Sequence, residues 1–338
     1  MIKMERYSRQ MLFMPIGEEG QRKITEKRVL IIGCGALGSA NAENLARAGI
    51  GELILVDWDY VEWSNLQRQQ LYTEADVENQ IPKAVAAKAR LHEINSEVEI
   101  EAYVMDADAI TLLPLLRGID LVMDATDNFD TRFMLNDLLQ KASIPWIFGS
   151  CVGSTGMSYT IFPNESPCLR CLLDAIPVNG ATCDSAGIIS PAVQMVVAHQ
   201  TTEALKILVE DQAALRTSLL TFDLWNNQYH TMKVERAKKQ TCPSCGENPS
   251  YPSLNYQRRT KSEVLCGRNT VQIRASQAPD FQLLKERLKR IGAVKANDFL
   301  ISVEYETYRL VFFQDGRTLI HGTNSIEKAK SIYYQLAG

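Results

Sequence analysis

The pattern of apolar positions between residues 28 and 148 alternates between short β-branched runs and longer amphipathic stretches. We expect buried strands over 29–32, 53–56, 121–125 and 146–148, an alternating strand over 98–104, and helices over 37–48, 82–93 and 130–141. Strands that alternate with helices favour a mostly parallel sheet covered by helices. The first half of the chain is therefore predicted to be an α/β domain.

The pattern changes after residue 149. Segments of β character follow over 153–162, 219–225 and 229–234, and Asn226-Asn227 between the last two is a pair that favours a turn. We expect these segments to extend the sheet with antiparallel strands. Ser190 and Pro191 are interpreted as the N-cap and first residue of an intervening buried helix.

The composition changes again after Cys245, where prolines and polar residues replace the alternating pattern. We place a first domain over 1–248, a linker over 249–263 and a second domain over 264–338. The second domain is expected to be small and α+β. Its elements are a strand over 270–274, a helix begun by Asp280, a strand over 299–305, a hairpin turn at Asp315-Gly316 and a helix opened by Ser325.

Composition and charge argue against a nucleic-acid-binding or membrane function. The chain has 46% hydrophobic and 22% charged residues, which is typical of a folded globular protein. Its net charge of −4 gives no basic excess for nucleic acid, so we expect no nucleic-acid partner. We find no apolar run long enough to span a bilayer, and the N-terminus is charged, so we expect a cytoplasmic protein without a membrane partner.

A glycine-rich turn follows the first predicted strand and opens the next helix, with the sequence Gly33-Cys34-Gly35-Ala36-Leu37-Gly38. Asp57 ends the second strand, 24 positions after Gly33. Glycines let the backbone approach a nucleotide, and a carboxylate at this place can accept hydrogen bonds from ribose. This predicts a Rossmann-like nucleotide site. It does not distinguish a dinucleotide for hydride transfer from ATP for group transfer.

Polar donors cluster near the same edge of the predicted sheet. Asn65 and Arg68 lie in the segment Ser64-Asn-Leu-Gln-Arg-Gln-Gln70, and Lys83 follows Pro82 at the start of a helix. Arginine offers a forked donor and lysine a compact charge, a set that suits a triphosphate better than a nicotinamide ring. The alternative is a solvated loop whose cations face water.

Asp127 and Asn128 follow another predicted parallel strand, at the edge where open α/β sheets bind ligands. Asp127 could hold Mg²⁺ and Asn128 could contact a polar edge of the ligand. The alternative for Asp127 is a helix N-cap, and both roles are compatible.

Two Cys-x-x-Cys pairs predict a metal site, namely Cys168 with Cys171 and Cys242 with Cys245. Four thiolates in such pairs give Zn²⁺ a closed tetrahedral structural site. The 70 residues between the pairs mean that the metal would join distant parts of the chain. Redox pairs or an iron–sulfur cluster are the alternatives.

Two further residues are weaker candidates. Cys183 lies in a run of small residues, where a mobile thiol could form a covalent adduct. Arg9 lies in an N-terminal arm that could deliver a cation to a neighbouring subunit, although a frayed terminus is the ordinary expectation.

Taken in order, these motifs resemble those of the adenylyltransferases that activate ubiquitin-like sulfur carriers, the MoeB and ThiF branch of the ubiquitin-activating-enzyme superfamily. The resemblance covers about residues 4 to 247. The residues that carry it are Arg6-Tyr-Ser-Arg9-Gln10, the glycine turn, Asp57, Ser64-Asn-Leu-Gln-Arg68, Pro82-Lys83, Thr126-Asp127-Asn128, both cysteine pairs and Thr182-Cys183.

The resemblance implies ATP-dependent adenylation of the C-terminal glycine of a carrier with a Gly-Gly tail. It assigns ribose to Asp57, close approach of the nucleotide to Gly35 and Gly38, the phosphates to Asn65, Arg68 and Lys83, and Mg²⁺ to Asp127. It also implies a homodimer in which Arg9 reaches the partner's site. Cys183 matches a loop cysteine that some relatives use to link covalently to the carrier.

Residues 250–338 contain no catalytic-cysteine loop of the rhodanese type, so a separate protein is expected to supply sulfur. An NAD-dependent oxidoreductase is one rival, but it leaves Arg68, Lys83 and Asp127 without roles. A non-catalytic, zinc-stapled subunit of an activating enzyme is another. The sequence leaves open whether the carrier serves molybdenum cofactor or thiamine thiazole synthesis.

Overall fold

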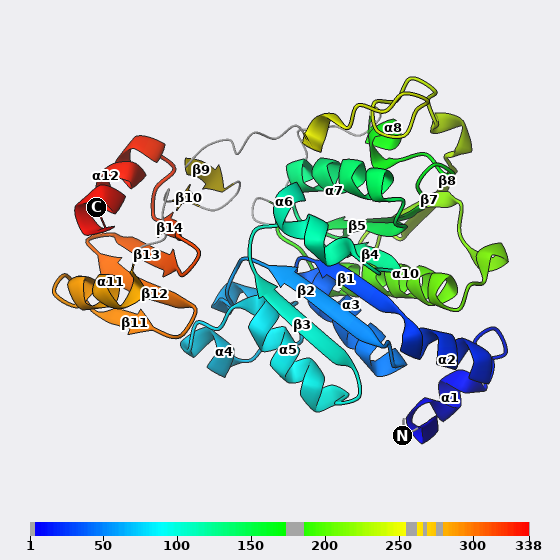
Figure 1. Cartoon of the computed structure of the whole chain (residues 1–338), viewed down its shortest axis with the longest axis horizontal. Helices are drawn as coiled ribbons and strands as arrows, with labels where there is room; N and C mark the ends of the chain where they lie inside the picture. Colours follow the sequence, from blue (N-terminus) through cyan, green and yellow to red (C-terminus); the bar gives the residue numbers. More distant parts are fainter. Residues whose placement is uncertain (1–3, 174–185, 255–261, 266–268, 275–279, 338) are drawn as a thin grey trace. The chain divides into compact units, whose positions relative to one another are not determined.

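A computed structural model describes residues 4–173, 186–254, 262–265, 269–274 and 280–337. The chain divides into two compact units, which are Met1–Val77 with Pro82–Asn255, and Glu78–Ile81 with Tyr256–Gly338. Each unit contains its own sheet (Figure 1). Of the helices in these residues, none is long and apolar enough to cross a membrane.

The first unit is built on an eight-stranded sheet in the order β3-β2-β1-β4-β5-β6-β7-β8. The first five strands in this order are parallel, and β6, β7 and β8 add to β5 in antiparallel fashion. The mostly parallel sheet and its antiparallel extension are confirmed. The strands are β1 Arg28–Ile32, β2 Glu52–Asp57, β3 Glu99–Val104, β4 Leu121–Asp124, β5 Trp146–Val152, β6 Thr155–Ile161, β7 Ser218–Asp223 and β8 Gln228–Lys233.

The helices along residues 4–254 precede β1 or lie between these strands in the chain. The α-helices are α1 Ser8–Met11, α2 Gly17–Glu26, α3 Ala36–Ala48, α4 Glu74–Glu78, α5 Lys83–Ile94, α6 Ala109–Leu112, α7 Phe129–Ala142, α8 Leu169–Leu173 and α10 Ser190–Leu208. Short 3-10 turns are η1 Met4–Tyr7, η2 Trp63–Asn65, η3 Leu113–Leu116, η4 Gln212–Ala214, η5 Glu235–Ala237 and η6 Pro252–Leu254.

Helices cover both faces of this sheet (Figure 1). On one face, Leu135 of α7 lies in a core cluster with Leu30 of β1 and Tyr159 of β6. On the other face, Val196 of α10 packs close to Gly156 of β6, whose Cα faces the opposite side of the sheet from the Tyr159 side chain. The buried runs predicted from the sequence, in the central strands such as β1, β2 and β4, are thus buried because helices cover both faces of the sheet there.

The second unit is a six-stranded antiparallel sheet in the order β11-β12-β13-β14-β10-β9. Its strands are β9 Ser262–Leu265, β10 Thr270–Arg274, β11 Val294–Ala296, β12 Leu300–Tyr305, β13 Tyr308–Phe313 and β14 Arg317–His321. Helices α11 Phe281–Leu288 and α12 Ile326–Ala337 pack into one cluster with the strands. Asp280 caps α11, and Gly316 turns the β13–β14 hairpin at a positive φ, so the predicted α+β character is confirmed.

Two local expectations are wrong. Ser190 is the first residue of α10, and Ile189 is the N-cap, so the helix begins one residue earlier than predicted and has no side-chain cap. Residues 17–26 form α2, for which we predicted no element. This helix begins with two acidic residues, which stabilise a helix N-terminus electrostatically.

Candidate nucleotide and metal sites

The glycine turn packs so closely that side chains cannot be added at two of its positions. Gly33 has a φ of +91°, and a Cβ there would lie 2.7 Å from the carbonyl oxygen of Ala125. A Cβ on Gly38 would lie 1.7 Å from the carbonyl oxygen of Gly33. A Cβ on Gly35 would meet only Nε2 of Gln69, at 3.8 Å. Gly33 and Gly38 are therefore needed for the turn itself, whereas Gly35 leaves open space at the N-terminus of α3.

Asp57 fixes this turn from the end of β2. Its Oδ2 accepts a hydrogen bond from the Cys34 backbone N–H at 2.6 Å, and its Oδ1 accepts one from the Asp59 N–H at 2.7 Å. Burial raises the pKa of Asp57, although the charge of Lys83 opposes the shift. The Cys34 side chain is buried in the core, and this burial raises the pKa of its thiol well above the ordinary value.

Lys83 is connected to the same cluster through Asp59. The two side chains are buried, and Lys83 Nζ lies 2.7 Å from Asp59 Oδ2. The Lys83 N–H also donates to the Asp59 carbonyl oxygen at 2.9 Å. The hydroxyl of buried Tyr72 lies within hydrogen-bond distance of the carbonyl oxygens of Cys34 and Lys83. The structure thus brings the glycine turn, Asp57 and Lys83 together, and Asp59 and Tyr72 are the links.

Asn65 is the last residue of η2, and Arg68 lies in the turn that follows η2. The buried Asn65 side chain accepts a hydrogen bond from the Glu62 N–H at 3.1 Å, so it shapes the turn. Arg68 is half-buried, and its Nη1 donates to the Ser64 carbonyl oxygen at 2.8 Å. Gln69, next in the chain, has a buried Oε1 without a hydrogen-bond partner beside the glycine turn. Arg68 is therefore tethered by its own turn.

Asp127 and Asn128 stand exposed just beyond β4. Asn128 is the N-cap of α7, because its Oδ1 accepts from the Thr131 N–H at 2.8 Å. The suggestion that Asp127 caps this helix is therefore wrong by one residue. The cap leaves the Asp127 carboxylate outside the helix.

Two buried polar residues that we did not predict hold this loop. Arg132 of α7 donates from Nε to Asp124 Oδ2 at 3.1 Å, and its Nη2 donates to the Thr126 carbonyl oxygen. Gln200 of α10 donates from Nε2 to the Asp124 carbonyl oxygen at 2.9 Å. Burial raises the pKa of Asp124, and the Arg132 charge opposes it. Both partners lie in helix interiors, where no local sequence signal marks them.

The N-terminal segment is packed onto the first unit. Tyr7 is buried, and its hydroxyl accepts from Asn95 Nδ2 at 2.9 Å. Gln10 donates to the Ala48 carbonyl oxygen at 3.0 Å. The frayed terminus considered above is therefore excluded for residues 7–10, while Arg9 between these anchors is exposed.

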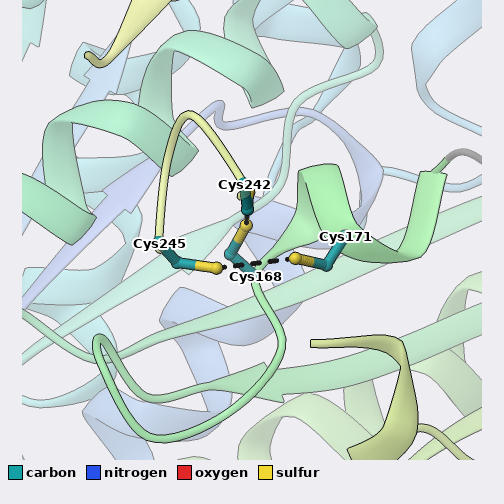
Figure 2. A group of neighbouring side chains, drawn as sticks. All are labelled: Cys168, Cys171, Cys242 and Cys245. Atoms are coloured by element: carbon teal, nitrogen blue, oxygen red, sulfur yellow. Dashed lines mark hydrogen bonds between the residues drawn. The ribbon is translucent and has the colours of Figure 1, made fainter. Parts of the chain in front are cut away.

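The two cysteine pairs converge at one point, as Figure 2 shows. All four sulfur atoms lie within 4.8 Å of one another. Cys168 Sγ and Cys242 Sγ are 3.7 Å apart, and Cys171 Sγ and Cys245 Sγ are 3.5 Å apart. A tetrahedral zinc with bonds of about 2.3 Å separates its sulfur ligands by about 3.8 Å. The four thiols, all buried, therefore fit Zn²⁺.

Cys183 lies outside the described residues, so its place relative to the glycine turn stays a prediction.

Comparisons with known proteins identify the family of the chain. The ThiF family matches residues 7–244. The sulfur carrier protein ThiS adenylyltransferase of Bacillus subtilis is 51% identical over 336 residues, covering 98% of this chain and 99% of that protein. The SAMP-activating enzyme E1 of Haloferax volcanii is 36% identical over 257 residues, covering 75% and 93%.

Among solved structures, the crystal structure of Escherichia coli MccB with ATP superposes with a TM-score of 0.62. It is 23% identical and covers 71% of this chain and 74% of that chain. At this identity the likeness concerns the fold alone.

Proposed function

Because the chain belongs to the ThiF family, we propose that it is an adenylyltransferase that activates a ubiquitin-like sulfur carrier at the expense of ATP. The observation that carries the proposal is the match along 98% of the chain to a ThiS adenylyltransferase. The connected cluster of the glycine turn, Asp57, Asp59 and Lys83 supports it, because it holds a carboxylate and a cation next to the N-terminus of α3, where backbone N–H groups can bind phosphate.

The proposed reaction joins the carrier to AMP. A C-terminal glycine carboxylate oxygen of the carrier attacks the α-phosphorus of ATP, the bond to the bridging oxygen of the β-phosphate breaks, and pyrophosphate leaves. The product is an acyl adenylate, a mixed anhydride that a sulfur nucleophile can open. No proton transfer to the carboxylate is required, so the protein's task is to position the groups and stabilise charge.

Several of the predicted residues have a role in this step. Asp57 binds the ribose, and the open space at Gly35 admits the phosphates to the N-terminus of α3. Asn65, Arg68 and Lys83 hold the phosphates. Asp127 would hold Mg²⁺, which supplies charge neutralisation on the leaving pyrophosphate. Arg9 would contribute from the second subunit of a homodimer.

We propose that the carrier is of the ThiS type, serving thiamine thiazole synthesis. The ThiS adenylyltransferase aligns with both units of this chain, whereas the archaeal relative aligns with 75% of it. Zn²⁺ would occupy the four-cysteine site. A separate protein would donate sulfur, and the location would be the cytoplasm.

Carrier-dependent exchange of labelled pyrophosphate into ATP tests the proposal. We expect exchange with a Gly-Gly-tailed ThiS-type carrier and little without it or with a molybdopterin-type carrier. Arg68→Ala should lower the rate by about 10²–10³. Arg90→Ala is the matched control, since Arg90 forms an exposed ion pair with Glu93 and lies outside the proposed site. Exchange by Arg68→Ala at the wild-type rate would contradict the assignment of Arg68.

Cys183 requires its own test, because adenylation does not need a thiol. If it links covalently to the carrier, Cys183→Ser abolishes sulfur transfer while pyrophosphate exchange continues. Sulfur transfer by Cys183→Ser at the wild-type rate would exclude the covalent role.

A further inference from the structure

A fully buried carboxylate lies beside the four-cysteine site and belongs to neither cysteine pair. Asp137, in the third turn of α7, has no exposed surface. Its Oδ1 accepts a hydrogen bond from the Ser244 hydroxyl, and its Oδ2 accepts one from the Ser253 N–H at 2.8 Å. Neighbouring Asn136 is also fully buried, and its Oδ1 accepts from the Leu169 N–H at 2.8 Å. One helix therefore contacts both cysteine pairs.

The two pairs are joined to each other at equivalent positions. Arg170 is the third residue of its pair, and Ser244 is the third residue of the other. Arg170 Nε donates to Ser244 Oγ at 2.9 Å, and its Nη2 donates to Ser253 Oγ at 2.8 Å. The guanidinium also lies 3.6 Å from Asp137 Oδ2 and stacks over the Phe133 ring at 4.7 Å.

A buried carboxylate next to a four-cysteine metal site is unfavourable electrostatically, so its presence needs a structural reason. Four thiolates around a divalent metal leave two negative charges, and a buried carboxylate nearby adds a third. Burial of an unpaired charge is costly, and hydrogen bonds with an opposite charge offset that cost. Arg170, Ser244 and the Ser253 N–H supply these here. An apolar side chain at position 137 would avoid the cost, but it could not bind both pairs.

We infer that Asp137 is a positioning residue for the metal site. Through Ser244 and Arg170, it fixes the two cysteine pairs relative to each other and to α7. The pairs come from segments 74 residues apart, so neither can place its sulfurs relative to the other by local geometry. Asp137 contacts one residue of each pair and so fixes the position of both pairs relative to α7. Partners beyond the ligands themselves typically change metal affinity 10–100-fold when they are removed.

The test measures metal release from the purified, zinc-loaded, full-length protein. Zinc transfer to an excess of a chromophoric chelator is followed by absorbance, without ATP or carrier. We expect Asp137→Asn to release zinc about 10–100-fold faster than wild type. Asp130→Asn, an exposed aspartate of the same helix, should release it at the wild-type rate.

A milder variant guards against loss of folding. Ser244→Ala keeps all four thiols and the Asp137–Arg170 pair but removes the hydroxyl between them, so it should accelerate release to an intermediate extent. Replacement of zinc by Co²⁺ reports geometry, and we expect weaker or shifted thiolate-to-cobalt absorption in both variants.

Release at the wild-type rate in Ser244→Ala, or in folded Asp137→Asn, would overturn the inference. So would a wild-type protein that binds neither Zn²⁺ nor Co²⁺. Because no step of the measurement uses nucleotide, its result is independent of the proposed adenylation.

Discussion

Lys83 and Asp59 form a buried ion pair, with Nζ 2.7 Å from Oδ2, at the edge where the nucleotide is proposed to bind. Removal of one member of a buried ion pair typically costs about 3–5 kcal/mol. The Asp57 carboxylate also interacts with the Lys83 charge, so we expect the lower end of this range here. We therefore predict that Asp59→Asn lowers the free energy of unfolding of the nucleotide-free protein by about this amount. Urea denaturation measures it.

The same variant tests whether phosphate can replace the carboxylate. MgATP should raise the melting temperature of Asp59→Asn more than that of wild type, because the phosphates then neutralise Lys83. Lys83→Met and the double variant Asp59→Asn/Lys83→Met complete a double-mutant cycle, which measures the interaction free energy of the two side chains. Free-energy losses that simply add in the double variant would contradict a direct interaction.

The glycine turn offers a matched pair of substitutions. In Gly38→Ala the new Cβ would lie 1.7 Å from the Gly33 carbonyl oxygen, so the helix must shift, and we expect a loss of about 1–3 kcal/mol or more in the free energy of unfolding. Gly35→Ala meets only Gln69 at 3.8 Å and should fold normally. It should raise the KM for ATP, because it fills the proposed phosphate space. Equal stability of the two variants would contradict the packing described here.

Removal of metal from the four-cysteine site should lower the melting temperature of the first unit. Structural zinc contributes on the order of 10 kcal/mol of binding free energy in small peptides, so even part of it is a large share of a domain's stability. Calorimetry of protein before and after chelation, and of Cys245→Ser, measures the change. Cys151→Ala, outside the cluster, should retain a full complement of zinc; unchanged melting after complete removal would argue against a structural role.

His199 in α10 gives a prediction for acid. Burial, with the neighbouring Arg216 cation, lowers the pKa of His199 below its ordinary value of 6.5. As the pH falls, the unfolded chain therefore takes up the proton first. The contribution of His199 to the free energy of unfolding is full above pH 6.5 and is lost as the pH falls from there to the folded-state pKa.

His199→Gln should therefore flatten the pH dependence of the free energy of unfolding in that window. Denaturation at a series of pH values measures it, with the exposed His92→Gln as control. If His199→Gln shows the same decline as wild type, His199 is not the responsible group.

Much of the sheet could be predicted because its information is local. Each central strand is a short apolar run between turn signals, and strands such as β1 and β2 lie where that pattern placed them. The four cysteines converge as their spacing indicated, and membership of the ThiF family is confirmed.

What could not be predicted depends on side-chain contacts that only the folded chain brings together, whether the residues are 8 or 76 positions apart. Asp59 pairs with Lys83, Arg132 with Asp124, and Gln200 with a carbonyl 76 residues earlier. The local sequence at these positions does not identify the partner, because the partner of a buried polar side chain depends on the tertiary fold. The roles of Arg9, Asp127 and Cys183 stay predictions.

The distance between the cysteine pairs also has a consequence for biosynthesis. The chain emerges from the ribosome N-terminus first, so the ligand set stays incomplete until Cys245 has left the exit tunnel. By then α10, β7 and β8 have all been made. Capture of the proposed metal would therefore be a late event, which joins the two ends of a segment that contains α10, β7 and β8 after all the parallel strands have been synthesised.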